Sequence, residues 1–356
     1  MTNGENIRLG FVGAGTMGLL HMETFGRITG VEMKAVADVS AIRAQAAATD
    51  YGLERAYTDS LELIEAPDID AIVISVPNAF HAELACSALR AGKHVLLEKP
   101  MAMNAEEARQ VLHAEKESGK TLMIGHQMRW KWPFPEVKRQ IAEGKLGQIY
   151  YVKTGWLRRK GIPGWGSAYT SQAMMGGGSA VDIGVHMLDI ALYLCSSSKP
   201  VGVYGASFGE IGKQRKGMGT WGIPNLAGKF DVDDLAVAMI RMEDGAVIHL
   251  EVSWAAFTDG EENGPYVHLM GNQGGVSIRD SGSHWMTECF DDSVDIPVAG
   301  AEERGDERLN LAEHFLHCVR TGSTPITDGR SGFVNQTIID ALYLSSKTGK
   351  EVQLEL

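Results

Sequence analysis

The sequence predicts an α/β domain built on a parallel sheet, followed by an α+β domain built on a mostly antiparallel sheet. Short apolar runs alternate with helical segments over roughly the first 125 residues, and longer runs with a period of two follow them. At 356 residues, the chain also exceeds the usual size of one hydrophobic core. We therefore expect one domain over residues 1–125 and a second over residues 126–356.

The first domain begins with a short apolar strand that enters a glycine-rich turn. Segments with helical spacing, such as residues 82–91, separate this strand from the later ones, which predicts a doubly wound parallel sheet. The expected strands are Ile7–Val12, Val31–Ala37, Ala71–Val76, His94–Leu97 and Leu122–Ile124.

Strands of the second domain alternate apolar and polar residues, which favours antiparallel pairing. Asp244 and Gly245 between two of these runs predict a hairpin turn. Two closing helices, Glu307–Thr321 and Ser331–Thr348, precede Gly349 and a short final strand. The other expected strands are Gln148–Thr154, Val201–Ser207, Leu235–Met242, Ala246–Trp254 and Tyr266–Met270.

Composition excludes several classes of partner. With 33 Lys and Arg against 45 Asp and Glu, the net charge of −12 argues against nucleic acid and anionic membranes. No apolar run reaches the roughly 18 residues that span a bilayer, so we expect a cytoplasmic protein. The cysteines form no CxxC pair, which predicts reduced thiols and no metal site; they are Cys86, Cys195, Cys289 and Cys318.

A GxGxxG motif, from Gly13 to Gly18, follows the first strand and opens a helix. In this context Gly13 permits the tight turn, Gly15 lets the backbone approach a pyrophosphate, and Gly18 lets the helix pack on the strand. The helix N-terminus at Thr16 and Met17 favours negative charge. The motif predicts a dinucleotide cofactor.

Asp38 ends the second strand, 20 residues after Gly18. Its carboxylate can accept hydrogen bonds from the adenosine ribose, whereas a 2′-phosphate would meet like charge. At an effective dielectric of about 20, unit charges about 4 Å apart interact by roughly 4 kcal/mol, so we expect NAD rather than NADP. Val39 adjoins this site, and Arg43 either reaches toward a 2′-phosphate or is a solvated helix residue.

Two more segments follow strands at the carboxyl edge of the sheet, where open α/β folds bind ligands. Pro77 and Asn78 are expected beside the nicotinamide ribose, and His81 is included in the cofactor site although a plain helix-start residue is the alternative. Glu98 and Lys99 follow the next strand and are also expected in the cofactor site. A lysine there can orient a substrate hydroxyl or relay its proton.

Gly176, Gly177 and Gly178 precede Asp182 and His186, which lie four residues apart on one helical face. The glycines are expected to admit close ligand approach. A neutral His186 can accept a hydroxyl proton while Asp182 fixes its orientation. The alternative is an ion pair on a surface helix.

These motifs together resemble the glucose-fructose oxidoreductase / inositol dehydrogenase family (Gfo/Idh/MocA). The likeness rests on the glycine fingerprint, on Glu98, Lys99 and Pro100, and on the Gly-Gly-Gly-x3-Asp-x3-His run, and it covers essentially the whole chain. It implies a Rossmann domain followed by a large, open-faced sheet domain. It also implies Lys99, Asp182 and His186 as the catalytic set, with His186 our preferred base and Lys99 the rival.

Substrate contacts are expected in the loop before the glycine run, where Arg158 and Trp165 supply a cation and an indole suited to a sugar ring. Family similarity makes Arg129 a wall residue of the same cleft. A structured surface loop is the alternative. The resemblance favours the subgroup that acts on glycosides or pyranoses, at the C3 hydroxyl, and leaves the particular sugar or inositol open.

We therefore expect an NAD-dependent dehydrogenase that removes hydride from a secondary hydroxyl carbon of a sugar or polyol. The alternatives are a glycosidase that uses bound NAD in transient oxidation and a non-catalytic NAD-dependent sugar sensor. The presence of Lys99, Asp182 and His186 argues against the sensor, since a pure binder needs no proton acceptor. An exposed sheet face would need cover, so we expect a homo-oligomer, either a dimer or a tetramer.

Overall fold

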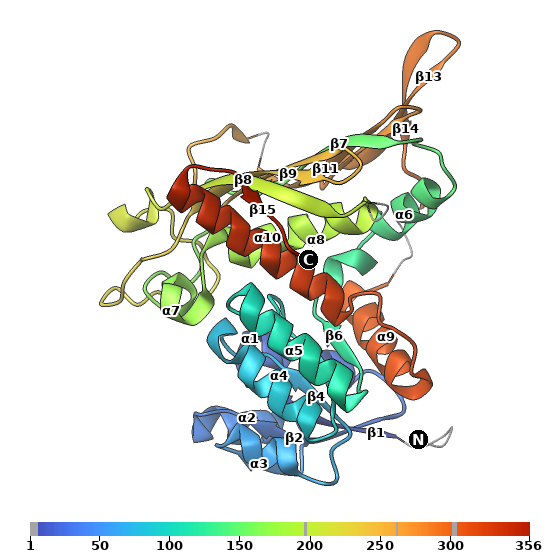
Figure 1. Cartoon of the computed structure of the whole chain (residues 1–356). Coiled ribbons are helices and arrows are strands. Elements are labelled where there is room, and N and C mark those ends of the chain that lie inside the picture. The colour runs from blue at the N-terminus through green and yellow to red at the C-terminus, as the bar shows by residue number, and fades with distance from the viewer. Residues whose placement is uncertain (1–5, 196–197, 261–262, 301–304) are drawn as a thin grey trace. The chain divides into compact units, whose positions relative to one another are not determined.

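The computed structural model describes residues 6–195, 198–260, 263–300 and 305–356. The chain forms two compact units (Figure 1). The first contains the described residues up to Gln127 together with Gly305–Gln336, and the second contains the described residues of Met128–Arg304 and Thr337–Leu356. Contacts thus group the helix near residue 310 with the first unit, which the sequence had not indicated. The predicted domain border after residue 125 stays a prediction.

The first unit is a doubly wound parallel sheet, as predicted, with strand order β3-β2-β1-β4-β5-β6. One strand, β3, was not predicted, because its three residues are too few to show a pattern. The strands are β1 (Ile7–Val12), β2 (Val31–Ala37), β3 (Arg55–Tyr57), β4 (Ala71–Ile74), β5 (His94–Leu97) and β6 (Leu122–Ile124). The helices are α1 (Thr16–Phe25), α2 (Ala41–Tyr51), α3 (Ser60–Glu65), η1 (Asn78–Phe80), α4 (His81–Arg90), α5 (Ala105–Ser118) and α9 (Glu307–Thr321).

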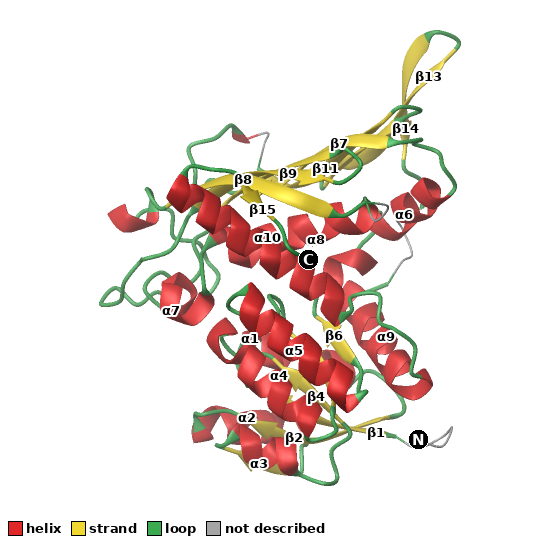
Figure 2. Cartoon of the chain, in the orientation of Figure 1, coloured by secondary structure: helices red, strands yellow, loops and turns green. Residues whose placement is uncertain are grey.

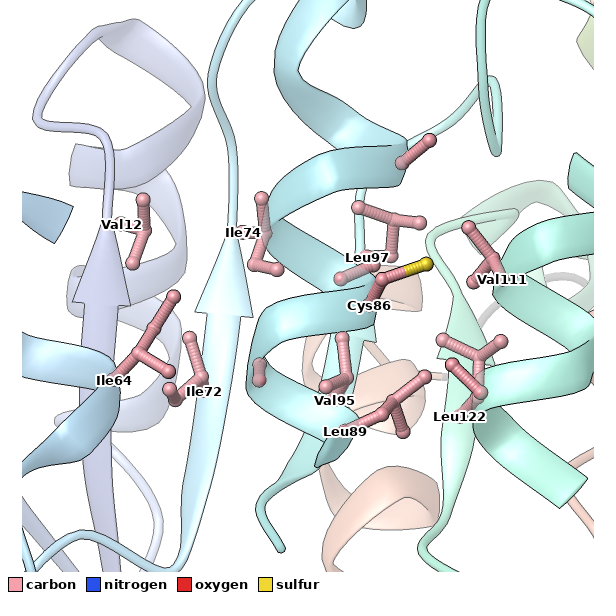
Figure 3. Close-up of a cluster of buried hydrophobic side chains, with 14 of the residues drawn as sticks. Val12, Ile64, Ile72, Ile74, Cys86, Leu89, Val95, Leu97, Val111 and Leu122 are labelled. Atoms are coloured by element: carbon pink, nitrogen blue, oxygen red, sulfur yellow. The ribbon is translucent and has the colours of Figure 1, made fainter. Parts of the chain in front are cut away.

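Apolar side chains of the central strands fill the core between sheet and helices. Ile72 and Ile74 of β4 are completely buried, as are Val95 and Leu97 of β5, and Leu89 of α4 packs with them (Figure 3). A parallel sheet covered on both faces needs such uninterrupted apolar strands. Because these strands run in parallel, their carboxyl ends meet at one edge, where the predicted cofactor residues lie.

The second unit is a nine-stranded sheet with order β14-β13-β12-β11-β7-β10-β9-β8-β15. All neighbours are antiparallel except β7 and β10, and the predicted hairpin joins β9 to β10 with Gly245 at a φ of 89°. The strands are β7 (Ile149–Leu157), β8 (Pro200–Phe208), β9 (Leu235–Met242), β10 (Val247–Ser253), β11 (Gly264–Gly271), β12 (Gly275–Arg279), β13 (Gly282–Cys289), β14 (Asp292–Pro297) and β15 (Val352–Gln353). Strands β12, β13 and β14 were not predicted.

Helices of the second unit lie on one face of its sheet (Figure 2). The backbone N–H of Gly205 on β8 donates to Ser345 Oγ of α10 at 2.9 Å, and Thr154 of β7 lies against α8. The opposite face carries partly exposed apolar side chains such as Tyr204 and Met239. The remaining helical segments are η2 (Gln127–Trp130), α6 (Phe134–Ala142), η3 (Ala168–Thr170), α7 (Gln172–Met175), η4 (Ala180–Gly184), α8 (Val185–Leu194), η5 (Gly212–Gln214) and α10 (Gly329–Thr348), the last of which contributes to both units.

The length and apolar character of the helices bear on membrane insertion. Within the described ranges, none of them combines the length and the apolar character needed to cross a bilayer. The four cysteines are free thiols, and Cys289 is the exposed one among them.

Candidate active site

The glycine turn after β1 leaves no room for a side chain at Gly13 or Gly18. Gly13 has a φ of 103°, and a Cβ there would lie 2.4 Å from the carbonyl oxygen of Ser75. A Cβ on Gly18 would lie 1.9 Å from the carbonyl oxygen of Gly13, so helix α1 packs directly on the turn. Gly15, by contrast, has open space within 4 Å of its Cβ position. The backbone at Gly15 is therefore accessible to a ligand.

Helix α1 presents its N-terminus without a competing anion. Gly15 is the N-cap residue and supplies no side-chain hydrogen bond, and the first turn contains no acidic residue. Thr16 is exposed and Met17 partly exposed. Such an end favours a phosphate group, so the turn and helix fit the pyrophosphate of a dinucleotide.

Asp38 is buried at the end of β2, and its carboxylate accepts several hydrogen bonds. The N–H of Ala14 donates to Oδ2 at 2.9 Å, the N–H of Ser40 donates to Oδ1 at 2.8 Å, and Arg43 pairs with Oδ1 at 2.8 Å. Burial opposes ionisation, but the hydrogen bonds from Arg43, Ser40 and Ala14 outweigh it and lower the pKa of Asp38. The carboxylate is held rigid and charged beside the exposed side chain of Val39.

Arg43 is largely exposed and forms an ion pair. Its side chain is 57% exposed, and its guanidinium pairs with Asp38. A cation neutralised in this way is a poorer partner for a 2′-phosphate, which strengthens the expectation of NAD over NADP. Its predicted place in the cofactor site stays a prediction.

His81 has both ring nitrogens occupied by backbone groups. Nδ1 lies 2.7 Å from the carbonyl oxygen of Pro100 and Nε2 lies 2.9 Å from that of Val76. The ring is buried, and burial lowers its pKa although both carbonyls favour the charged form. We therefore correct the predicted role of His81 from a cofactor ligand to a support that holds the loop of Pro77 and Asn78, of which Asn78 is also buried.

Glu98 also lies inside the first unit. Its Oε1 is 2.8 Å from Nε2 of His21 on α1, and its Oε2 accepts from the N–H of Lys99 at 3.1 Å. Burial raises the pKa of Glu98, but His21 and Lys99 overcome this and lower it to about 2. A permanently ionised Glu98 therefore fixes the backbone of Lys99 to helix α1, and the side chain of Lys99 is partly exposed.

The glycine run before Asp182 has a different purpose from the one predicted. A Cβ on Gly177 would lie 2.1 Å from Oη of Tyr343, and one on Gly178 would lie 1.9 Å from the carbonyl oxygen of Asp233. The chain's own residues fill the space that was expected to admit a ligand. Glycine is required here because α10 and the loop before β9 pack against the start of the helix.

Asp233 is the buried carboxylate that holds this helix start. It accepts from the N–H of Gly178 at 2.8 Å, from Ser179 Oγ at 2.6 Å and from the N–H of Ala180 at 3.0 Å. The hydroxyl of Tyr343 donates to it at 2.6 Å. A carboxylate at a helix N-terminus satisfies donors that have no partner within the helix.

Asp182 and His186 follow on a helix that starts with a π-helical turn, η4, and continues as α8. Such turns are frequent at functional sites. Oδ2 of Asp182 accepts the indole N–H of Trp254 at 2.9 Å, and His186 is buried. The predicted support of His186 by Asp182 stays a prediction.

Arg129 is a buried structural residue of the second unit. Its guanidinium donates to both carboxylate oxygens of Asp189, at 2.9 and 2.6 Å, and lies 5.0 Å from the ring of Tyr193. Asp189 and Tyr193 both belong to α8, which carries His186. This bidentate pairing makes Arg129 an anchor of that helix, and its place in the cleft wall stays a prediction.

Arg158 and Trp165, predicted as substrate ligands, differ in their surroundings. Trp165 is 3% exposed and donates its indole N–H to the carbonyl oxygen of Gly212 at 2.8 Å, which contradicts a stacking role. The guanidinium of Arg158 stacks on Trp156 at 4.4 Å and makes no hydrogen bond or ion pair with any described residue. Burial lowers the pKa of Arg158, and the nearby Asp182 carboxylate opposes this change. Arg158 thus offers unused donors beside Asp182.

Sequence reasoning missed Asp233, Asp189 and Trp254. Asp233 lies between two predicted strands and belongs to no recognised motif, and Trp254 is the last residue of the predicted strand Ala246–Trp254. Their partners lie far away in the chain, so only the folded structure identifies them. The predicted site residues themselves fall into a nucleotide-binding edge in the first unit and a helix in the second.

Comparison with protein families decides the classification. A model of an oxidoreductase family with an NAD-binding Rossmann fold, Gfo/Idh/MocA, matches residues 7–126, and the model of that family's C-terminal domain matches residues 134–277. The chain belongs to the Gfo/Idh/MocA oxidoreductase family. It is an enzyme that uses NAD, in agreement with the geometry of the glycine turn and Asp38.

Curated relatives in this family extend over nearly the whole chain. D-glucoside 3-dehydrogenase of Escherichia coli (strain K12) is 32% identical over 98% of this chain and 97% of its own length. 1,5-anhydro-D-fructose reductase of Ensifer adhaerens is also 32% identical, over 98% of both chains. A scyllo-inositol 2-dehydrogenase (NAD(+)) of Bacillus subtilis (strain 168) is 27% identical over 99% of this chain and 97% of its own.

A solved structure supports the fold. Levoglucosan dehydrogenase in complex with NADH superposes with a TM-score of 0.85 at 24% identity, over 99% of this chain and all of the other. The Rossmann domain followed by an open-faced sheet domain, expected from the sequence, is thereby confirmed.

Trp254→Phe should slow turnover about tenfold or more, because a buried hydrogen bond to a charged group is worth about 1.5–3 kcal/mol. Phenylalanine keeps an aromatic ring but is smaller than tryptophan, so the variant loses the donor to Asp182 together with some buried packing volume. Without it the carboxylate form is less favoured, and the acid limb of the kcat profile should move to higher pH. Steady-state rates across pH measure both effects.

Trp165→Phe is the matched control, because it removes an equally buried indole N–H that donates to a backbone carbonyl. It should lower Tm by a similar amount and leave the acid limb in place. An equal shift of the limb in both variants would mean that Trp254 acts only through general packing.

Proposed function

We propose that the protein is an NAD-dependent dehydrogenase that oxidises a secondary hydroxyl of a sugar, glycoside or inositol, at C3 where the substrate is a pyranose. The observation that carries this proposal is that Asp182 lies on the same helix as His186 and accepts a hydrogen bond from the indole of Trp254. The chain is also similar along its length to a D-glucoside 3-dehydrogenase. The nucleotide-binding edge of the first unit supplies the oxidant.

Oxidation of an alcohol releases one hydride and one proton. NAD, when bound, accepts the hydride from the carbon that carries the hydroxyl. We assign the proton to His186, with Asp182 steadying the imidazolium that forms, and assign to Lys99 the orientation of the hydroxyl oxygen. The product is a ketone, and the proton leaves His186 to solvent before the next turnover.

Arg158 is the substrate-binding residue that the geometry favours. Its donors have no acceptor among the described residues, although neighbouring side chains largely cover the guanidinium. The side chain is partly exposed, so these donors can reach a ligand with oxygen atoms without a change in the fold. Two neighbouring hydroxyl oxygens of a sugar ring suit the fork of donors on a guanidinium.

The open face of the second sheet supports the proposal of a homo-oligomer. Tyr204, Phe208 and Met239 of this unit are each about half exposed, and such apolar side chains gain from cover by another copy. We assign no number of subunits beyond a dimer or a tetramer.

Asp38→Ala should weaken NAD binding and improve NADP binding. The substitution removes the charge that opposes a 2′-phosphate and also releases Arg43 from its ion pair. Titration calorimetry with each dinucleotide measures both affinities. The double variant Asp38→Ala/Arg43→Ala lacks the released cation and should gain less NADP affinity. Unchanged selectivity in Asp38→Ala would remove Asp38 as the ribose ligand.

Lys99→Ala and His186→Ala should each lower kcat at least tenfold while the Kd for NAD stays the same. Positioned proton transfer contributes about 10²–10⁴-fold to rate, and neither residue is needed to hold the dinucleotide. His113→Ala and Lys116→Ala on the exposed face of α5 are matched controls and should keep full activity. Turnover at the wild-type level in either test variant would exclude that residue from the mechanism.

Formation of NADH tests the proposed reaction directly. Purified protein with NAD is mixed with inositols, free pyranoses and aryl glycosides, and absorbance of NADH is followed. We expect a signal with at least one of these classes. Cleavage of a glycoside with no net NADH would instead favour a glycosidase that uses bound NAD.

A further inference from the structure

The hairpin of β13 and β14 extends beyond the rest of its sheet (Figure 1). β12 pairs with β13 only as far as Met286, so the last three cross-strand pairs, from Thr287–Val294 to Cys289–Asp292, continue without a strand on that side. Three residue steps correspond to roughly 10 Å of free ribbon. We call residues 287–295 the arm.

The tip of the arm is an exposed aromatic residue in a costly conformation. Phe290 is 96% exposed and has a φ of 53°, and Asp291 follows with a φ of 66°. Turns of this shape favour asparagine and glycine, and a bulky residue in the left-handed region is a strained outlier. Strain of this kind occurs mainly where function requires it. Folding of the monomer provides no reason for phenylalanine at this place.

The arm is also strongly acidic. Its four carboxylates are exposed, and none forms an ion pair with a residue in the described ranges; they are Glu288, Asp291, Asp292 and Asp295. Charges on an edge strand do protect against aggregation. That role would not require Phe290 among them, so the arm has the composition of a contact surface, with an apolar centre and a charged rim.

A surface of opposite charge lies elsewhere on the same unit. Residues 158–170 and 209–230 form two paired loops, joined by the N–H of Ile162 to the carbonyl of Gly217 at 2.9 Å and by the N–H of Gly164 to that of Trp221 at 2.8 Å. We call them the cationic double loop. Its exposed charged side chains are six cations and one carboxylate, Glu210, and the exposed Asp231 follows directly; the cations are Arg159, Lys160, Lys213, Arg215, Lys216 and Lys229. The double loop is therefore cationic in a chain of net charge −12.

The cationic double loop also exposes apolar side chains. Ile223 is 88% exposed, and Trp221 and Leu226 are each about half exposed. An apolar site rimmed by cations is the complement of a phenylalanine rimmed by carboxylates. Aromatic anchors in apolar sites, with charges around them, are the usual centre of a specific protein interface.

The arm cannot reach the cationic double loop of its own chain. Seven strand spacings separate β14 from β8, which is about 34 Å across the sheet. The tip of the arm lies at the end of the sheet where β8 begins. Residues 209–230 leave the sheet at the other end, after Phe208, the last residue of β8, which pairs with Leu235. Residues 158–170 follow β7, four strand spacings from β14, and leave the sheet at the same end as residues 209–230. The arm and both halves of the double loop therefore lie at opposite ends of the strands. Only another molecule can bring them together.

We propose that the arm of one copy docks on the cationic double loop of a second copy, with Phe290 seated among Trp221, Ile223 and Leu226. This contact specifies how the proposed homo-oligomer is built and is independent of the proposed reaction. It also covers the loop that carries Arg158, whose strand end lies beside Trp254 and Asp182. Each copy then helps to enclose the substrate loop of its partner.

Cys289 allows a direct test on the unmodified protein. It adjoins Phe290 and is exposed, whereas Cys86, Cys195 and Cys318 are buried. A short cross-linker that joins a thiol to an amine is applied to a mixture of ¹⁴N- and ¹⁵N-labelled protein, and linked peptides are identified by mass spectrometry. We expect links of mixed label between Cys289 and Lys213, Lys216 or Lys229. An oligomer in which Cys289 links only to lysines outside the double loop would overturn the proposal and leave the homo-oligomer intact.

Charge reversal supplies an independent test. One variant carries Glu288→Lys, Asp291→Lys and Asp292→Lys, and the other carries Lys213→Glu, Lys216→Glu and Lys229→Glu. Each alone should raise the Kd for self-association at least tenfold, and an equimolar mixture should restore assembly. Sedimentation velocity measures association, and circular dichroism with NAD titration verifies folding.

Glu62→Lys/Glu65→Lys, on the exposed side of α3, is the matched control and should assemble like the wild type. Two outcomes contradict the proposal: a wild-type protein that stays monomeric at all concentrations, and a mixture of the reversed variants that assembles no better than either alone. A mixture that assembles, with mixed-label links to the double loop, supports it.

Discussion

The carboxylate of Asp233 organises the second unit. It accepts hydrogen bonds from the start of the helix that carries Asp182 and His186, and also from Tyr343 on α10. Without these acceptors, buried donors at the helix start would lose their partners, and such donors are expensive to leave unpaired. Three segments far apart in the sequence therefore meet at one side chain. The position of this helix depends on the Asp233 side chain, as the lack of space at Gly177 and Gly178 also shows.

At the carboxyl edge of the parallel sheet, a single carboxylate also connects several segments of the backbone. Asp38 is hydrogen-bonded to the glycine turn through Ala14 and to the start of helix α2 through Ser40 and Arg43, so the residue predicted to select the cofactor also fixes the local backbone. Selectivity and rigidity are thus linked, because the same hydrogen bonds that position the carboxylate keep it ionised. Glu98 is likewise kept ionised by the groups that position it: His21 and the backbone N–H of Lys99 both bind its carboxylate.

Much of this fold could be predicted from the sequence, because its strands are either continuously apolar or strictly alternating. Leu235–Met242 and Glu307–Thr321 were located to the residue. Strands β12 to β14 were not predicted: β12 alternates but has only five residues, and exposed residues break the pattern of β13 and β14. The site was harder. Motifs in the sequence identify Lys99, Asp182 and His186 as candidates. Trp165 and Arg129 look equally suited to binding a ligand. Only the structure shows that Trp165 donates to Gly212 and that Arg129 pairs with Asp189, so both hold the fold.

The position of β7 has a consequence for how the protein is made. This strand lies inside the sheet, with Lys153 between His249 of β10 and His268 of β11, each roughly 100 residues later in the chain, a long-range pairing of the kind that slows folding. During synthesis β7 leaves the ribosome with both edges unpaired and must wait for partners that do not yet exist. Open edges of this kind are where nascent chains pair with each other. Yield in the cell is therefore expected to depend on what shields this strand while the rest of the sheet is translated.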